Sequence, residues 1–172
     1  MSEGILLPAL PRTLLPLEQR LLRLDEATPQ VLAATADEPD PIAIQATLAC
    51  LLWQTMLQTS WCGFYRRVAE RELAVGPYQG TMGCLRIAFD RGVCGLAARE
   101  ARVVRVPDVH AFPDHIACDG GTRSELVVPV LHRGRLEAVL DLDSYEPDAF
   151  SDEEGARLSS LLERAFAGAR FG

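Results

Sequence analysis

Apolar residues recur at helical spacing in two stretches of the chain, and each stretch begins with a capping signal. Asp40-Pro41 predicts a helix over residues 42–57, because Asp accepts hydrogen bonds at an N-cap and Pro is preset for a first turn. Ser151 and Glu154 have the spacing of a capping box and predict that the last helix starts at Ser151. Shorter helical stretches are expected near residues 14–24 and over residues 92–100.

Strand-like runs occupy most of the chain between these helices. They are expected over residues 61–68, 72–76, 81–89, 101–106, 125–132 and 136–144. Residues 107–124 show no periodicity and are rich in Pro, Gly, Asp and His, which predicts a long loop of the kind that often carries function. The order of helices and strands predicts an α+β fold in which helices pack on a mostly antiparallel sheet.

The hairpin expected over residues 125–144 has a definite register if both of its strands cover one core. On the second strand, Leu136 begins an apolar row that continues at every second residue, because side chains alternate between the faces of a strand. The apolar rows of the two strands share one face only when paired residue numbers add up to an even number. A three-residue loop at 132–134 satisfies this condition and puts Gly134 in the left-handed conformation that such loops favour.

The same parity puts three carboxylates, those of Glu125, Asp141 and Asp143, together on the opposite face. Carboxylates this close repel one another, so we expect either a proton held by one of them or a cation between them. The ammonium group of a ligand would meet that need, as would a metal ion, and a protonated carboxyl is also a general acid. The alternative is a solvated face of the sheet, which antiparallel sheets often have.

Length and composition narrow the functional classes. The chain has 172 residues, of which 48% are hydrophobic and 24% charged, and this fits one globular domain. A net charge of −7 disfavours nucleic-acid binding, which needs a basic face, and no apolar run reaches the ~18 residues of a membrane span. The N-terminal residues do not read as a secretory signal, so we expect a cytoplasmic protein with neither nucleic acid nor membrane as a partner.

The chain has five cysteines, at positions 50, 62, 84, 94 and 118. The odd number and the absence of a Cys-x-x-Cys pair argue against a disulfide framework and a structural zinc site. Cys118 lies at the end of the long loop, whereas Cys94 lies near the start of a helical stretch whose dipole would lower the pKa of its thiol. Cys50 and Cys62 fit the commoner role of a buried apolar side chain.

Several motifs, in order along the chain, together resemble the free methionine-(R)-sulfoxide reductases, which are stand-alone GAF domains. They occupy residues 61–65, 76–80, 84–87, 91–95, 108–119, 124–129 and 139–144. The resemblance implies a single GAF-like catalytic domain over residues 39–172, preceded by an N-terminal extension with a short helix over residues 1–38. Its fold would be a central antiparallel sheet with helices packed on one face and the pocket on the other.

The resemblance also implies how the thiols act. The cysteine at the position of Cys118 attacks the sulfoxide sulfur, methionine leaves, and a sulfenic acid remains. The cysteine at the position of Cys84 then closes a disulfide that thioredoxin reduces, and the cysteine at the position of Cys94 is a secondary participant in recycling. The residues alone do not decide whether Cys84 or Cys94 bonds to Cys118 first. No bound cofactor is implied, and a homodimer is compatible with the family.

Substrate recognition would involve acids, aromatic rings and backbone N–H groups. In the family, acidic residues bind the substrate and help to protonate its oxygen, and they match Glu125, Asp141 and Asp143. Trp61 matches an aromatic wall of the pocket, and Tyr65 is expected on the same face of its strand because the two are an even number of residues apart. Backbone N–H groups near Ile116 and Ala117 suit the carboxylate of an amino-acid substrate.

Two other classes of function stay open. A non-catalytic GAF sensor of a small molecule would share the fold and would not need a loop cysteine beside acids. A metal-dependent hydrolase would combine the three carboxylates with a histidine and would retain or require its ion.

Overall fold

The computed structural model describes residues 11–113 and 118–172. Within these residues the helices are α1 (Leu17–Ala34), α2 (Pro41–Thr55), α3 (Gly92–Glu100) and α4 (Asp152–Ala165), with a short 3-10 helix at Val109–Ala111. The strands are β1 (Trp61–Ala69), β2 (Glu72–Gly80), β3 (Arg86–Ala88), β4 (Val104–Val106), β5 (Ser124–His132) and β6 (Arg135–Ser144).

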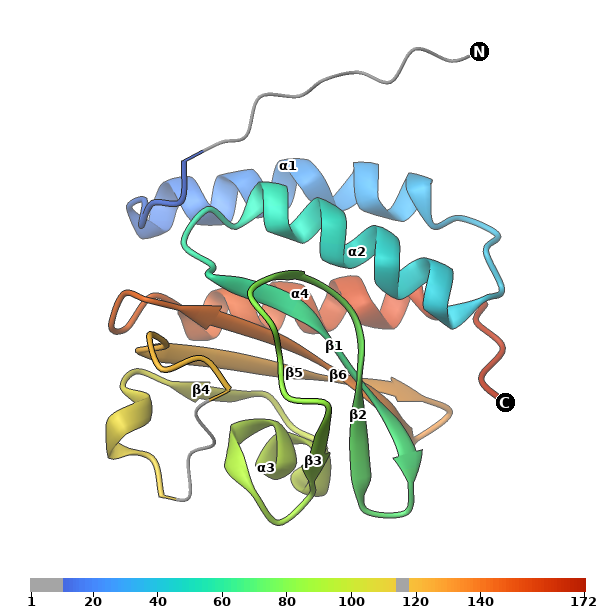
Figure 1. The fold of residues 1–172 in the computed structure, drawn as a ribbon. Helices are drawn as coiled ribbons and strands as arrows, with labels where there is room; N and C mark the ends of the chain where they lie inside the picture. The colour runs from blue at the N-terminus through green and yellow to red at the C-terminus, as the bar shows by residue number, and fades with distance from the viewer. Residues whose placement is uncertain (1–10, 114–117) are drawn as a thin grey trace.

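The strands form one antiparallel sheet in the order β3-β2-β1-β6-β5-β4. Helices α1, α2 and α4 form a layer on one face of this sheet, and α3 lies on the other (Figure 1). The core between the sheet and the three-helix layer includes Phe64, Leu140 and Phe166, which are almost fully buried. The predicted α+β class is confirmed, and α3 is the helix that lies apart from the others. None of the helices in the described part of the chain combines the length and apolar character that crossing a bilayer requires.

Local sequence signals start the two helices that were predicted from caps. The Asp40 carboxylate accepts a hydrogen bond from the Ile42 N–H at 2.8 Å, and α2 begins at the proline between them. At α4 the Ser151 hydroxyl accepts from the Glu154 N–H at 3.1 Å, and the Glu154 carboxylate accepts from the Ser151 N–H at 2.8 Å. The capping box is therefore complete, and both predicted helix starts are confirmed.

Helix α1 is longer than the helical stretch expected near residues 14–24. It continues through Pro29, a residue that removes a backbone donor from a helix interior. Leu24 and Val31, each 1% exposed, lie on either side of Pro29 and bury this helix in the core. Tertiary packing therefore sustains α1 past a residue that local propensity disfavours. The division of the chain between residues 38 and 39 stays a prediction.

The β5–β6 hairpin differs from the prediction at its turn. Arg133 and Gly134 form a two-residue turn with φ values of 52° and 78°, so the three-residue loop expected at 132–134 is wrong. One extra residue on β6, Glu137, restores the even sums over the rest of the hairpin. The irregularity moves Leu136 away from the apolar row expected of it and into the hydrophobic cluster on the other face.

The strands that precede α3 also differ from expectation. β2 continues to Gly80, and the strand expected over residues 81–89 is limited to β3. Residues 81–84 leave the sheet at a point where the Trp61 indole donates a hydrogen bond to the Thr81 carbonyl at 3.0 Å. Because a side chain satisfies this carbonyl, the backbone does not need a neighbouring strand there and can leave the sheet. β4 is likewise shorter than the strand expected over its part of the chain.

Candidate active site

A pocket opens on the face of the sheet opposite the three-helix layer, beside α3. The cross-strand register brings its floor together, because Trp61 on β1 and Glu125 on β5 both pair with Asp143 on β6. Gly63 on β1 pairs with Asp141, so the residue beside the central acid has no side chain.

Three carboxylates line this pocket, those of Glu125, Asp141 and Asp143, and we call them the acid cluster. Glu125 and Asp141 are 6% and 5% exposed and Asp143 is half-buried, so this face of the sheet is not a solvated one. Burial raises the pKa of Asp141 to about 6. Burial first, and then the charge of Asp141, raises the pKa of both Glu125 and Asp143 well above the ordinary range. Asp141 therefore ionises first, and its charge favours protons on the other two.

Cys94 on α3 faces the acid cluster. Its thiol donates a hydrogen bond to Glu125 Oε1 at a sulfur–oxygen distance of 3.8 Å, and the residue is 3% exposed. Burial, followed by the charges of Asp141 and Glu125, raises the pKa of this thiol well above its ordinary value. The expectation that the helix start lowers this pKa is wrong, because burial and two carboxylates outweigh the dipole of a helix of 9 residues.

Cys84 and Cys118 form a disulfide beside the pocket, with their Cα atoms 5.3 Å apart and a sequence separation of 34 residues. Cys84 lies on the loop between β2 and β3, and Cys118 lies in the long segment between β4 and β5. Both are half-buried, and Cys118 lines the pocket together with the acid cluster. Of the two partners that the sequence left open for Cys118, the structure pairs it with Cys84 and leaves Cys94 as a free thiol.

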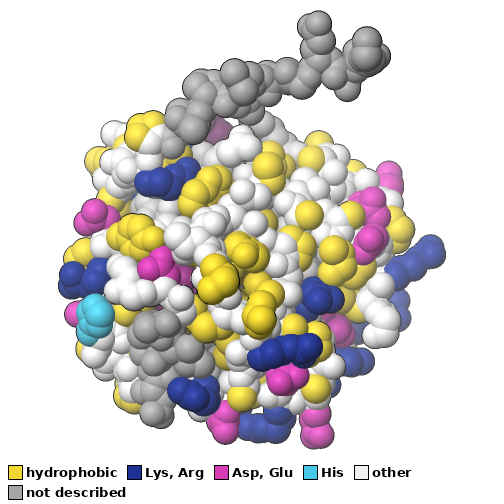
Figure 2. Space-filling model, in the orientation of Figure 1, with side chains coloured by type: hydrophobic (Ala, Val, Ile, Leu, Met, Phe, Trp, Pro, Cys, Tyr) yellow, Lys and Arg dark blue, Asp and Glu magenta, His cyan; other side chains and the backbone are white. Residues whose placement is uncertain are grey.

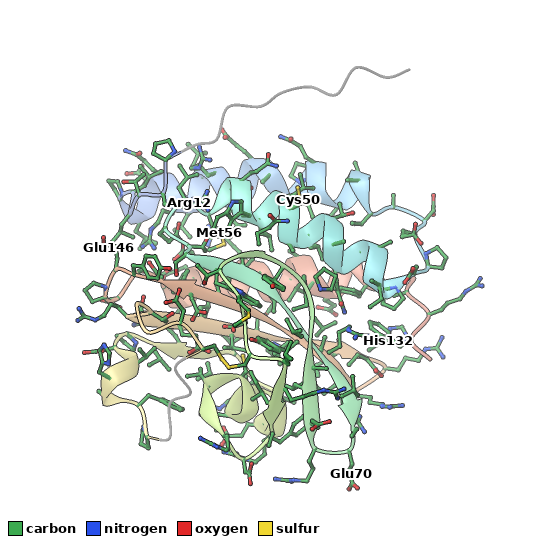
Figure 3. The ribbon with its side chains drawn as sticks, viewed as in Figure 1. Arg12, Cys50, Met56, Glu70, His132 and Glu146 are labelled. Atoms are coloured by element: carbon green, nitrogen blue, oxygen red, sulfur yellow. A yellow bond between two sulfur atoms is a disulfide. The ribbon has the colours of Figure 1, made fainter. Side chains whose placement is uncertain are left out.

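The two remaining cysteines lie elsewhere. Cys62 is buried in the core under the three-helix layer, as expected, and burial raises the pKa of its thiol. Cys50 is exposed on α2, away from the disulfide (Figure 3), so the expectation that it is buried is wrong. Leu48 and Leu52 on the same helix face the core, and a residue two positions from either of them falls on the outer side.

Aromatic rings form one wall of the pocket. The rings of Trp61 and Tyr65 stack with centroids 5.5 Å apart and planes 20° apart, and Trp61 also stacks on Tyr78 at 5.1 Å. Trp61 and Tyr65 both line the pocket, so they share a face, as the strand spacing predicts. Gly63 leaves room for the stack, because a Cβ there would lie 2.8 Å from Trp61 Cη2 and would also collide with Tyr78.

A hydrogen-bonded clasp, which sequence reasoning missed, joins the two segments that carry the disulfide. The Asp119 carboxylate accepts hydrogen bonds from the Tyr145 hydroxyl at 2.7 Å, the Thr81 hydroxyl at 2.9 Å and the Gly121 N–H at 2.9 Å. These bonds, with that from Tyr145 foremost, lower the pKa of Asp119. An Asp two residues before a glycine is a typical turn signal. That signal gives no indication of the contacts with Thr81 and Tyr145, which are distant in sequence.

Some of the expected site residues are not brought to the pocket. Ile116 and Ala117, expected to bind substrate, lie outside the described residues, as does His115. His110 and His132 lie in the described part of the chain, and neither lines the pocket. Within residues 11–113 and 118–172 the acid cluster therefore has no histidine beside it, and a hydrolase site of carboxylates and histidine finds no support there.

The surface beside the disulfide is apolar. Met82 and Leu85, which are 77% and 72% exposed, flank Cys84 on the loop between β2 and β3. In the view of Figures 1 and 2 this loop crosses in front of the sheet, and hydrophobic side chains gather in the middle of that face. Charged side chains lie mostly around the edge of the same face.

Known proteins share both the sequence and the fold. The GAF domain family model matches residues 40–165. The free methionine-R-sulfoxide reductase of Escherichia coli (strain K12) is 38% identical over 130 residues, which cover 76% of this chain and 78% of that protein. Protein YtsP of Bacillus subtilis (strain 168) is 41% identical over 142 residues, or 80% of this chain and 87% of that protein. The solved structure of the free methionine-R-sulfoxide reductase from Neisseria meningitidis in complex with its substrate has a TM-score of 0.80 and 39% identity, and covers 84% of this chain and 87% of that one. This chain therefore belongs to the free methionine-R-sulfoxide reductase family of GAF-domain proteins.

Proposed function

We propose that this protein reduces free methionine-(R)-sulfoxide to methionine, with Cys118 as the nucleophile and Cys84 as the thiol that resolves the intermediate. The observation that carries the proposal is the pairing of Cys84 with Cys118 beside a pocket whose floor is a cluster of buried acids. A dithiol supplies the two electrons that sulfoxide reduction requires, and the acids supply the proton that the departing oxygen requires.

The reaction proceeds in two balanced steps. The Cys118 thiolate attacks the sulfoxide sulfur and takes up the oxygen, which becomes protonated, so that methionine leaves and a sulfenic acid remains on Cys118. The Cys84 thiol then displaces that oxygen as water, and the disulfide forms. The Cα separation of 5.3 Å between the two cysteines is within the range of an ordinary disulfide, so this step needs no large movement of the backbone.

The acid cluster has two tasks in this scheme. Asp141 ionises first, and its Oδ1 atom is buried without a hydrogen-bond partner, so it suits the ammonium group of a free amino acid. Glu125 and Asp143 have the higher pKa values, because burial and the charge of Asp141 hold protons on them, and they are the proton donors. Glu125 is the more deeply buried of the two, and its carboxyl accepts a hydrogen bond from the Cys94 thiol.

The remaining parts of the substrate meet other groups. The indole of Trp61 offers an apolar surface to the S-methyl group, and Tyr65 extends that surface. The substrate carboxylate would bind to N–H groups near Ile116 and Ala117, which lie outside the described residues.

A thioredoxin-like protein is the proposed reductant. The disulfide is half-buried rather than enclosed, and exposed Met82 and Leu85 flank Cys84, so an apolar protein surface has access to the bond. A thiolate of the reductant attacks the disulfide, a mixed disulfide forms, and the second thiol of the reductant releases both cysteines of this protein in reduced form.

The proposal is tested by following NADPH oxidation in the presence of thioredoxin, thioredoxin reductase and methionine sulfoxide. We expect turnover of the free R epimer and none of the S epimer or of a substrate whose amino and carboxyl groups are blocked. Equal turnover of the blocked substrate would refute the ammonium site. Cys118→Ser should abolish turnover, Cys84→Ser should give one turnover and then stop, and Cys50→Ser is the matched control. Binding of the sulfoxide without any turnover by the wild-type protein would favour a sensor instead.

A further inference from the structure

Three potential metal ligands meet at the floor of the pocket. The Sγ atom of Cys94 and one carboxylate oxygen each from Glu125 and Asp141 all lie within 4.8 Å of one another. They come from three separate elements, α3, β5 and β6, which the sheet and its packing hold in place. All three residues are buried, and all three line the pocket, so the arrangement is preformed and open on one side.

One carboxylate oxygen of this group lacks a hydrogen-bond partner in the part of the chain that the structure describes. Asp141 is 5% exposed, and its Oδ1 atom has no hydrogen-bond partner among the described residues. A buried carboxylate oxygen without a donor is costly and points to a ligand at that position. The unpartnered Asp141 oxygen is therefore evidence for a ligand that is independent of the clustering of the three side chains.

The donor set selects a particular class of metal ion. One thiolate with two carboxylates suits Zn²⁺, which accepts sulfur and oxygen ligands in tetrahedral geometry and keeps a fourth position open in sites with three protein ligands. Zn–S and Zn–O bond lengths imply a sulfur–oxygen separation of about 3.5 Å between tetrahedral ligands. The observed separation between Cys94 Sγ and Glu125 Oε1 is 3.8 Å, which a small adjustment of side chains corrects. Ca²⁺ and Mg²⁺ require a larger set of oxygen ligands.

We propose that Cys94, Glu125 and Asp141 form a Zn²⁺-binding site whose occupation excludes the substrate. The metal binds as Zn²⁺ displaces the proton of the Cys94 thiol and any proton on the two carboxyls into solvent, with no change of oxidation state. The fourth ligand is a water molecule in the pocket. The exclusion step rests on the proposed function, because it takes Asp141 as the partner of the substrate's ammonium group and Glu125 as a proton donor. Metal binding itself does not depend on these roles.

The binding step is tested on the oxidised protein, in which the disulfide removes Cys84 and Cys118 as ligands. Titration with Co²⁺, a spectroscopic substitute for Zn²⁺, should produce thiolate-to-cobalt charge-transfer absorption with one ion per chain, and Zn²⁺ should abolish it. Cys94→Ser should remove this absorption, whereas Cys50→Ser, which changes an exposed thiol, should leave it intact. Absence of the absorption, or its survival in Cys94→Ser, would overturn the site.

A second variant keeps the test independent of how Cys94→Ser folds. Glu125→Gln should weaken Zn²⁺ binding, measured by calorimetry, by more than the roughly 10- to 100-fold that loss of an outer-shell partner causes. Ca²⁺ and Mg²⁺ should not compete. Affinity that is unchanged in Glu125→Gln, or displacement of Zn²⁺ by Mg²⁺, would contradict the assignment.

The exclusion step has its own readout. Free methionine should weaken the apparent Zn²⁺ affinity of the oxidised protein in proportion to its concentration, and Zn²⁺ should raise the KM for the sulfoxide without lowering kcat. Zinc that binds at Cys94 but does not compete with methionine would overturn the exclusion and leave the reductase proposal intact. Failure of the reductase assay itself would show in the absence of any added metal, so the two proposals fail separately.

Discussion

Replacing Asp141 by Asn should stabilise the protein at neutral pH while it weakens substrate binding. Burial raises the pKa of this carboxyl from 3.8, its ordinary value, to about 6, so the folded state holds the proton more tightly than the unfolded state does. As the pH rises from 3.8 to 6, the unfolded chain has already lost this proton while the folded chain still keeps it, so the free energy of unfolding falls. At 1.36 kcal/mol for each pKa unit, the loss amounts to about 3 kcal/mol and is complete above pH ~6.

Asn has the shape of the protonated acid and does not ionise, so Asp141→Asn should recover most of this amount. The variant and the wild type should differ little in stability near pH 3 and by up to about 3 kcal/mol at pH 8. The charge of Asp141 also raises the pKa of Glu125 and Asp143, so in the variant both acids should give up their protons at lower pH. The alkaline limb of the turnover profile should therefore move to lower pH, in addition to a higher KM for the sulfoxide.

The measurement is urea unfolding of the oxidised proteins at pH 3, 5 and 8, with EDTA present so that adventitious metal does not contribute. Asp90→Asn, at an exposed turn before α3, is a control that removes one acidic charge without touching the pocket. A stabilisation that is the same at all three pH values would mean that burial of the Asp141 charge is not its source. Destabilisation at pH 8 would contradict the reasoning outright.

Two further predictions concern packing and the clasp. Gly63→Ala should lower the free energy of unfolding by about 1–3 kcal/mol, because the added methyl group collides with Tyr78. Gly120→Ala is the control and should change the free energy of unfolding little, because no heavy atom lies within 4 Å of the new Cβ. Urea unfolding of the two variants measures both effects. Asp119→Ala should slow formation of the disulfide after one turnover by about tenfold, because two exposed hydrogen bonds, one of them from Thr81, together contribute roughly 1–2 kcal/mol. Rapid-quench mass spectrometry measures that rate, and an unchanged rate would show that the clasp does not position the thiols.

The part of the site that the sequence predicts well depends on strand parity. Side chains alternate strictly along a strand, so the positions of Asp141 and Asp143 relative to an apolar row already place them on one face, and Glu125 follows from the register. The turn of that hairpin was predicted less well, because a three-residue loop and a two-residue turn with a bulge give the same parity beyond the bulge. Local pattern does not distinguish them, and the two differ only at the turn itself and in the face on which Leu136 lies.

Contacts between residues that are distant in sequence are beyond the reach of periodicity. The choice of Cys84 over Cys94 as partner of Cys118 depends on where two loops meet, and the pKa of Cys94 depends on acids from other elements. The sequence near Cys94 predicts a lowered pKa from the helix start alone, whereas the fold surrounds the thiol with carboxylates. Cys50 is a different kind of error, because the helical spacing of the buried Leu48 and Leu52 already puts position 50 on the outer side of α2.

One set of hydrogen bonds explains two features of this region. The strand expected over residues 81–89 does not form in full, and Cys84 and Cys118 come together as a disulfide. The Trp61 indole donates a hydrogen bond to the Thr81 carbonyl, and this bond lies where the ladder of β2 ends. The Thr81 hydroxyl donates a hydrogen bond to Asp119, the residue directly after Cys118. The hydrogen bonds that take this segment out of the sheet therefore also bring the loop of Cys84 to the loop of Cys118. A continuous strand here would satisfy the same backbone groups within the sheet and would hold Cys84 in the ladder. The departure from regular structure is thus the feature that places two thiols, far apart in sequence, at one pocket, and it explains why a pattern-based strand prediction fails at this point of the chain.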